Sequence, residues 1–560
     1  MKIHDAARRG DIRGVARELK AGVAVDVREH SSDPSALSCV CALPDADPQM
    51  ILFLITQGAV ISPEVFEAAI RSGNFDTMRM LLRFGAKVDA REEGHCGALT
   101  LAVYAHSSPG DTILLPLLTF LLEHGADTDI VSSYGESALS VASNNGRFDA
   151  VQFLLDRGAD PTPLQWTELL HTVALGSVEE VRTLLEQGAS LQDRDWWERT
   201  PWLLSLQTGD LHKVELLLTA GADRNDVGRC GKTPLQFAIE MNQPALLRWL
   251  IAEGFDVNCS DDFGHTPLRT AAEYGYADCV AVLLNAGAKP KEADAIGQLP
   301  IQEAANLSVA RLLIAAGEDL SEVNEEVRRE LAGTTGGDLQ ATQAQFEAGR
   351  NRTFGNTNPE RTLNPFWRAM IQAGCNAYRA RALFEETKPY TDTAQPVWCY
   401  QRFGRTTTLL PDGRIIEIAG EHEDHYDYDF CIYNDVVVFD GKGDFEILSY
   451  PERIFPPTDF HTATLVGNSL YIIGCLGYPS QRKARETPVY RLDCRTFQIE
   501  YIRTFGEKPG WVSEHKAWYE AGAHRICLSG GQIVGRKTVP NTRTYALDLT
   551  DHRWTLLPQR

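Results

Sequence analysis

The chain has 560 residues and a formal net charge of −22, which is more sequence than one hydrophobic core organises, so several domains are expected. Hydrophobic residues make up 43% and charged residues 23%, as in ordinary globular proteins, which excludes wholesale disorder and a membrane-embedded composition. The sequence contains no uninterrupted apolar run of about 18 residues and begins without the apolar stretch of a secretory signal. We therefore expect a cytoplasmic protein.

Charge divides the chain into two differently built parts. Residues 1–330 contain 28 Lys and Arg against 49 Asp and Glu, whereas residues 331–560 contain 26 against 27. The acidic part is expected to repel nucleic acid and to attract basic protein surfaces over long range. The simpler alternative is that this charge only keeps an elongated body in solution.

The acidic part is built from repeats, each closed by a glycine that follows an apolar run. These glycines are Gly22, Gly58, Gly85, Gly125, Gly158, Gly188, Gly221, Gly254, Gly287 and Gly317. Before them, apolar residues at helical spacing predict a helix with a left-handed C-cap. Upstream, Thr200, Thr233 and Thr266 each precede a Pro, where Thr caps a helix and Pro fits its first turn. Each unit is thus predicted to be a pair of helices.

A unit of 33 residues with a Thr-Pro start, an Ala-rich first helix and a Leu-Leu-x-x-Gly-Ala ending resembles the ankyrin repeat family. The resemblance covers about residues 3–320, or about ten units, although Gln236 and Arg269 replace the family's His and the unit at 164–192 lacks Thr-Pro. It implies an α-solenoid that binds proteins through its hairpin tips and first helices.

The predicted tips carry an apolar stripe in register, formed by Tyr134, Trp197, Cys230, Phe263 and Ile296. Carboxylates lie beside this stripe. The candidate protein-binding residues are Tyr134, Asp193, Asp195, Trp196, Trp197, Asp226, Asp261, Asp262 and Phe263. Aromatic rings beside carboxylates suit a partner that presents Arg or Lys over apolar ground. The alternative is that each aromatic packs on the next tip, although two adjacent Trp in an extended tip point opposite ways, which predicts one exposed ring.

Residues 331–394 are expected to be a connector because of their Gly, Thr, Asn and Pro content. Within it, residues 364–386 begin with Asn-Pro and place apolar residues at helical spacing, which predicts one docking helix. Its Phe366 and Trp367 either anchor a partner or, as we favour, join the two parts of the chain.

Residues 395–560 change to short strands in three similar units. Gly420, Gly474 and Gly530 follow strands at intervals of 54 and 56 residues, a spacing that fits four strands per unit. These small-residue positions and a later aromatic such as Trp554 resemble the kelch motif, although only the third unit has the full Gly-Gly.

The kelch resemblance implies an all-β partial propeller with three recognisable blades, whereas complete propellers have about four to eight. Three explanations are open for the missing blades. The three blades pack on the array and the docking helix, strands before residue 395 form a diverged fourth blade, or two chains join through open strand edges.

A dense group of His and carboxylates occupies residues 421–429. In an extended strand, alternate residues point the same way, which would group nitrogen and oxygen ligands on one side. The candidate ligands of a divalent metal are His422, His425, Asp427 and Asp429. The alternative is a solvated loop without metal. Two further histidines, His461 and His515, head matching strands and are expected to hydrogen bond to a neighbouring unit rather than to line a pocket.

No nucleophile elbow, phosphate loop, zinc-protease motif or dinucleotide fingerprint occurs in the sequence, so neither an enzyme nor a cofactor is expected. The sequence predicts a multidomain interaction scaffold or adaptor. It comprises an ankyrin solenoid over 1–330, a connector over 331–394 and a kelch-like β domain over 395–560 as a second binding surface. Its partner is predicted to be a basic protein, and neither nucleic acid nor membrane.

Three alternatives to this scaffold are open. The acidic array could act as an inhibitor that neutralises a basic toxin or nuclease. The β domain could be a metal-dependent enzyme or a ligand-binding domain centred on residues 421–429. The open strand edges could make the protein a self-associating scaffold.

Overall fold

The computed structural model describes residues 2–28, 33–90, 96–318, 320–334, 336–384, 396–422, 430–535 and 537–558. The chain divides into two compact units, residues 1–298 and 299–560. Within the described ranges, no helix combines the length and the apolar character needed to cross a bilayer.

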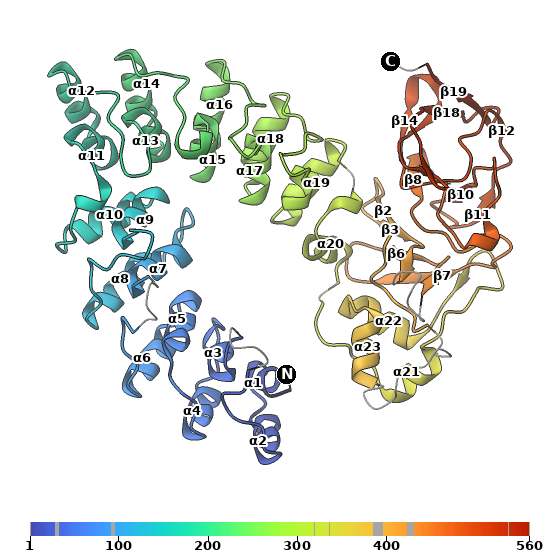
Figure 1. Ribbon diagram of the computed structural model, residues 1–560, viewed down its shortest axis with the longest axis horizontal. Helices are drawn as coiled ribbons and strands as arrows, with labels where there is room; N and C mark the ends of the chain where they lie inside the picture. The colour runs from blue at the N-terminus through green and yellow to red at the C-terminus, as the bar shows by residue number, and fades with distance from the viewer. Residues whose placement is uncertain are drawn as a thin grey trace. The chain divides into compact units, whose positions relative to one another are not determined.

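The first unit is an array of helix pairs, coloured from blue to green in Figure 1. Its helices are α1 (Lys2–Arg8), α2 (Ile12–Lys20), α3 (Ala36–Cys41), α4 (Pro48–Thr56), α5 (Pro63–Ser72), α6 (Phe75–Arg83), α7 (Ala98–His106), α8 (Leu114–Glu123), α9 (Ala138–Asn144), α10 (Phe148–Leu155), α11 (Glu168–Leu175), α12 (Val178–Glu186), α13 (Pro201–Thr208), α14 (Leu211–Thr219), α15 (Pro234–Glu240), α16 (Pro244–Ala252), α17 (Pro267–Glu273) and α18 (Ala277–Asn285). The first helices of successive pairs pack on one another from α1 to α9 and from α11 to α17.

The helix ends follow from local chemistry, as the unit at α15 and α16 illustrates. The Thr233 hydroxyl accepts a hydrogen bond from the Gln236 amide at 3.4 Å, and Pro234 occupies the first turn of α15. After α16, Gly254 has a φ of 88°, the left-handed region that glycine adopts without a steric penalty. The predicted pairing of helices is thus confirmed for this unit.

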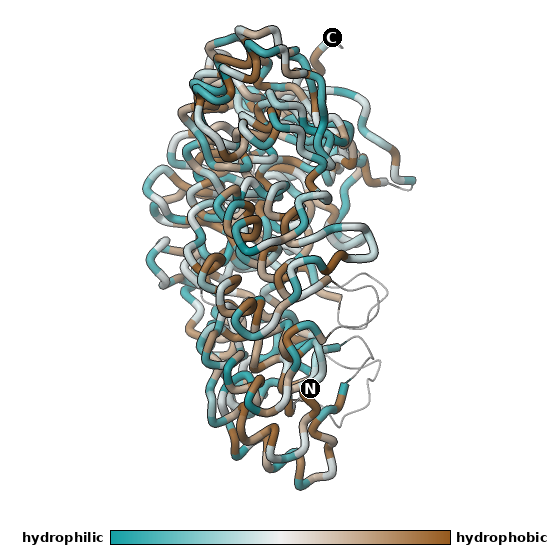
Figure 2. Tube along the Cα trace, turned by 90° about the vertical axis from the view of Figure 1, so that its left-hand side faces the viewer, coloured by the Kyte–Doolittle hydropathy of each residue, from teal (hydrophilic) through white to brown (hydrophobic). Residues whose placement is uncertain are grey.

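The second helix of a pair, such as α4, buries one face, whereas first helices such as α3 and α13 are buried almost all round, and together they form the apolar core of the array. In Figure 2, hydrophobic and hydrophilic stretches alternate along the helix pairs, as expected for helices with one buried face. One cluster of buried apolar residues extends from Ile3 to Leu164, and another extends from Leu169 to Leu217. The half-buried Phe148 and Trp166 pack against both clusters, so they join the two parts of the core.

The array changes direction between α9 and α11, where the unit without Thr-Pro lies (Figure 1). Here a short 3-10 turn, η1 (Thr162–Leu164), packs on α9, while α10 packs on α11. Gln165, directly after η1, has a φ of 52° and so takes a backbone conformation that side chains rarely adopt. We call this change of direction the corner of the array.

The second unit begins with helices and short 3-10 turns. These are η3 (Pro300–Glu303), α19 (Leu307–Ala315), η4 (Leu320–Glu322), α20 (Glu325–Ala332), α21 (Gln343–Gly349), α22 (Pro365–Ala373) and α23 (Ala377–Phe384). The prediction of one docking helix over 364–386 is wrong, because α22 and α23 are separate helices. Gly374 ends α22 with a φ of 59°, and the Asn376 side chain then caps α23 by accepting the Arg379 amide at 2.8 Å.

Helix α22 joins the helices of the second unit to its sheets. The Trp367 ring is fully buried and stacks on Trp398 at 4.7 Å, and its indole nitrogen donates to the Gly349 carbonyl at 2.7 Å. The Trp398 indole in turn donates to Asp435 at 2.8 Å. Arg402 forms a buried ion pair with the same carboxylate. Trp367 therefore belongs to the core of the second unit and is not available to a partner, whereas a role of this helix in joining the two parts of the chain stays a prediction.

Three antiparallel meanders of four strands form the β-rich part. The first has β2 (Thr406–Leu409), β3 (Ile415–Ile418), β6 (Val436–Phe439) and β7 (Phe445–Ser449), the second has β8 (Thr462–Val466), β9 (Ser469–Ile473), β10 (Val489–Asp493) and β11 (Ile499–Tyr501), and the third has β14 (Lys516–Glu520), β15 (Arg525–Ser529), β18 (Tyr545–Asp548) and β19 (Arg553–Leu556). The predicted repeat of four strands is thus present three times.

Short strands extend the meanders at their edges. β1 (Glu360–Arg361), from the predicted connector, pairs with β7, and β12 (Phe505–Gly506) pairs with β19. The smaller pairings are β4 (Glu421–His422) with β5 (Cys431–Ile432), and β13 (Val512–Ser513) with β16 (Gln532–Ile533) and β17 (Val539–Pro540). The described strand before residue 395 therefore extends the first meander and does not build a fourth blade. The strands in the described ranges close neither a barrel nor a propeller.

The first strands of neighbouring meanders pack together, β2 on β8 and β8 on β14. His461 Nε2 is hydrogen bonded to the Thr406 hydroxyl at 2.8 Å, and His515 Nε2 to the Thr462 hydroxyl at 2.9 Å. The expectation that these histidines bond to the neighbouring unit is therefore confirmed. Burial lowers the pKa of both imidazoles to about 3, so both remain neutral at neutral pH.

Candidate functional site

The hairpin tips of the array are shaped by aspartates that bind the backbone of their own turn. Asp261 Oδ1 accepts the amides of Phe263 at 3.0 Å and His265 at 2.9 Å. Asp294, 33 residues later, accepts the amides two and four residues further on at 3.0 and 2.8 Å. Gly264 follows Phe263 with a φ of 80°. The tips are therefore formed before any partner arrives.

Three of the carboxylates predicted to face a partner are already bound inside the array. Asp195 is buried and ion-paired with the buried Arg199. Asp226 accepts from Arg194 at 2.6 Å and from the Thr200 hydroxyl at 2.7 Å. Asp261 accepts hydrogen bonds from the backbone amides of its own turn, as described above. For these three residues the prediction of a carboxylate presented to a partner is corrected, whereas Asp193 is half-buried and Asp262 is exposed.

The two tip tryptophans close the corner of the array. Trp197 donates from its indole nitrogen to the Ser140 carbonyl at 2.9 Å, across 57 residues of sequence. The rings of Trp196 and Trp197 meet edge to face at 4.6 Å. The Arg229 guanidinium lies 5.2 Å from the first ring and 5.4 Å from the second. Both rings are half-buried, so the expectation of one exposed ring is wrong.

Side chains of α13 and of the tip before it also bind the last carbonyls of α9. A helix leaves its final carbonyl groups without intrahelical partners. Arg199 donates to the Ser143 carbonyl at 2.8 Å and Gln207 donates to the Asn144 carbonyl at 3.0 Å. Together with the bond from Trp197 to the Ser140 carbonyl, these bonds hold α9 to α13 and to the tip before it.

The other members of the apolar stripe are exposed. Tyr134 is 82% exposed, Ile296 77% and Phe263 56%, and Cys230 is also exposed. Backbone hydrogen bonds connect three successive tips, from the Asp262 amide to the Cys230 carbonyl at 3.0 Å and from the Ala295 amide to the Phe263 carbonyl at 3.2 Å. Adjacent tips thus present apolar side chains from one connected ridge.

A hollow on the first helices escaped the sequence analysis. It has a volume of about 210 Å³ and is lined by Tyr104 of α7, Asn145 beside α9, and Tyr274 and Tyr276 at the end of α17. Tyr274 and Tyr276 are stacked at 5.6 Å. Helices this far apart in the sequence share a hollow because the array turns at the corner, which no local pattern reveals.

The candidate metal ligands are only partly described. His422 lies in β4, is buried, and is paired through the backbone with Cys431. His425, Asp427 and Asp429 lie outside the described residues. Among the residues that are described, no group of three or more His, Cys, Asp or Glu side chains is arranged to hold a metal ion. A metal at residues 421–429 therefore remains an untested prediction.

A comparison with known protein families finds a match in the helical array. The family model described as ankyrin repeats in three copies matches residues 66–165, 110–195, 169–261 and 242–324. A search of curated proteins finds no match. This family model therefore finds ankyrin repeats in the N-terminal part of the chain, and ankyrin repeats indicate a protein–protein interaction module.

Proposed function

We propose that this chain is an interaction protein that binds a protein partner through a tip strip, defined as Cys230, Asp262, Phe263 and Ile296. The observation that carries the proposal is the exposure of the Phe263 and Ile296 side chains on two tips joined by a backbone hydrogen bond. Large apolar side chains on neighbouring rigid tips are typical anchors of an interface. Because the turns are preformed, binding loses little conformational entropy there.

We further propose that the partner is basic. Residues 1–330 contain 49 acidic against 28 basic side chains, and the exposed Asp262 lies beside the apolar anchor Phe263. A field of this sign accelerates the approach of a positively charged surface, and salt screens it within about 10 Å at 0.1 M. Rising salt should therefore slow association more than it speeds dissociation.

The β-rich part is proposed to be a kelch-like partial propeller that offers a second binding surface. Three meanders of four strands with packed first strands, and histidines that bond across both junctions, support this proposal. Equivalent positions in successive blades of a propeller occupy equivalent places around its axis.

The test is capture of partners from lysate with the wild type and a Phe263→Ser, Ile296→Ser double variant. Both side chains are exposed, so the variant should unfold at the temperature of the wild type while losing affinity by about tenfold or more per anchor. Leu52→Ser, which removes an apolar side chain that is 44% exposed on α4, is the control. A partner that the double variant retains as well as the Leu52→Ser control does would contradict the proposal that the tip strip binds it.

A further inference from the structure

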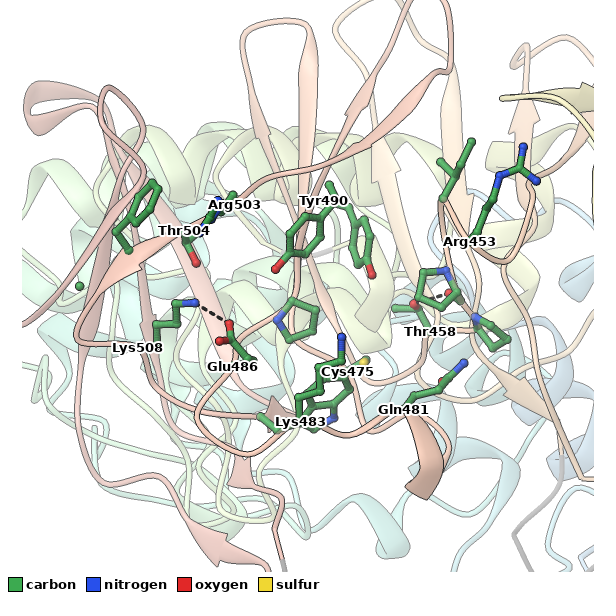
Figure 3. A pocket seen from close by; sticks show the side chains of 18 residues that line it. Arg453, Thr458, Cys475, Gln481, Lys483, Glu486, Tyr490, Arg503, Thr504 and Lys508 are labelled. Atoms are coloured by element: carbon green, nitrogen blue, oxygen red, sulfur yellow. Dashed lines mark hydrogen bonds and ion pairs between the residues drawn. The ribbon is translucent and has the colours of Figure 1, made fainter.

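A large pocket lies in the β-rich part, where β11 leads into β12. Its volume is about 860 Å³, within the range of sites that hold small organic molecules. Its walls come from residues 453–458, 475–490 and 501–511. Figure 3 shows side chains from these segments surrounding one space.

Aromatic rings form much of the wall. Tyr490 of β10 and Tyr501 of β11 meet edge to face at 5.6 Å. Trp511 is buried, and its indole nitrogen is bound to the Leu476 carbonyl at 3.0 Å, so its ring is fixed. Phe505 of β12 adds an exposed ring at the rim. Such a wall suits a flat apolar body.

One hydroxyl in the pocket has no partner within the described part of the protein. The Thr504 side chain is 3% exposed, and its Oγ1 makes no hydrogen bond to any described residue. A buried hydroxyl without a partner is unfavourable, so such groups are rare in folded proteins. In Figure 3 this hydroxyl faces the same space as Glu486 and Lys508. A ligand that accepts its proton would supply the missing bond.

The charge around the pocket is positive. Lys508 is ion-paired with Glu486 at 2.5 Å. Among the described residues, no carboxylate pairs with the other three cations of the lining, Arg453, Lys483 and Arg503. Residues 331–560 are nearly neutral as a whole, so this excess of positive charge is local. A concave, positively charged wall concentrates anions.

We propose that this pocket binds a small organic anion with a flat apolar body. The body lies against Tyr490, Tyr501 and Phe505, and a carboxylate or phosphate group is held by Lys483, Arg503 and Lys508. The Thr504 hydroxyl donates to the same ligand. This site is independent of the protein-binding surface proposed for the array.

The test is calorimetric titration of the full chain with 2-naphthoate, 2-naphthyl phosphate and the neutral 2-naphthalenemethanol. At least one charged probe should bind about tenfold more tightly than the neutral one, and the tighter of the two identifies the anionic group. Absence of binding by both charged probes at millimolar concentration, or equal affinity for the neutral probe, overturns the proposal.

Variants separate a ligand site from a structural feature. Thr504→Val should weaken the charged probe about tenfold while leaving the unfolding temperature unchanged or raised, because the hydroxyl has no partner to lose. Arg503→Gln should also weaken binding, and Lys516→Gln, an exposed cation of β14, should not. A Thr504→Val variant with a lowered unfolding temperature and unaltered binding would assign the hydroxyl to the fold and overturn its role in the site.

Discussion

Arg199 forms a buried group of hydrogen bonds at the corner of the array. Its guanidinium is 1% exposed and binds Asp195 Oδ2 at 2.8 and 2.6 Å, the Ser143 carbonyl at 2.8 Å and the Ser143 hydroxyl at 2.6 Å. Arg199→Ala leaves the Asp195 carboxylate buried without its counterion, which costs about 3–5 kcal/mol. Arg79→Ala, which removes an exposed pair with Asp76, should cost about 0.5 kcal/mol or less.

Hydrogen–deuterium exchange of the full chain measures this effect where it occurs. A loss of about 3 kcal/mol should accelerate exchange through local opening of α9 and α13 by about 100-fold. Asp195→Ala combined with Arg199→Ala should be less damaging than Arg199→Ala alone, because no charge then remains buried. Exchange of α9 and α13 in Arg199→Ala that matches Arg79→Ala would refute the assignment of the corner to this ion pair.

Two further predictions concern acid stability and backbone strain. Because burial lowers the pKa of His461 and His515 to about 3, against about 6.5 unfolded, the unfolded chain binds more protons below pH 6.5. As the pH falls below about 6.5, each histidine should then lower the free energy of unfolding by about 1.4 kcal/mol per pH unit. Urea titrations at pH 7 and pH 5 should therefore show a smaller loss of stability for His515→Gln than for the wild type. An equal loss in both proteins would contradict the burial argument. Glu198 has a φ of 63° at the tip position that glycine occupies in other units, so its backbone is strained. Glu198→Gly should therefore raise the free energy of unfolding by about 1 kcal/mol, measured by thermal denaturation. A decrease in the free energy of unfolding would contradict strain at this position.

The helix pairs could be predicted because their signals are local. A Thr cap, a Pro in the first turn and a closing glycine, as at Thr233 and Gly254, fix both ends of a helix within a few residues. The break at Gly374 was equally local and was missed, because the apolar spacing continues through it. The corner could not be predicted, since it depends on bonds such as that between Trp197 and Ser140, across 57 residues.

The candidate site also combines features that the sequence indicates and features that it does not. Exposure of Phe263 and Ile296 was one of two interpretations that the sequence left open, and position at a tip does not decide between them, since Trp197 at the equivalent position is half-buried. The prediction that the tip aspartates face a partner was wrong for Asp261, which binds the backbone of its own turn. Asp261 and Asp294 recur at the repeat interval of 33 residues, which is the pattern expected of a residue that shapes each turn. The pocket around Thr504 could not be foreseen, because only the tertiary fold brings its three segments together.

Site-specific photocrosslinking tests the central claim that the tip strip binds a protein. A benzophenone side chain is placed at Phe263, at Ile296 or, as a control, at the exposed Glu215 of α14, and the protein is irradiated in cells. The account predicts one discrete adduct of the same mass from both tip positions, reduced at high salt, and none from position 215. Adducts only from position 215, or none from either tip while a partner is still captured, would contradict it.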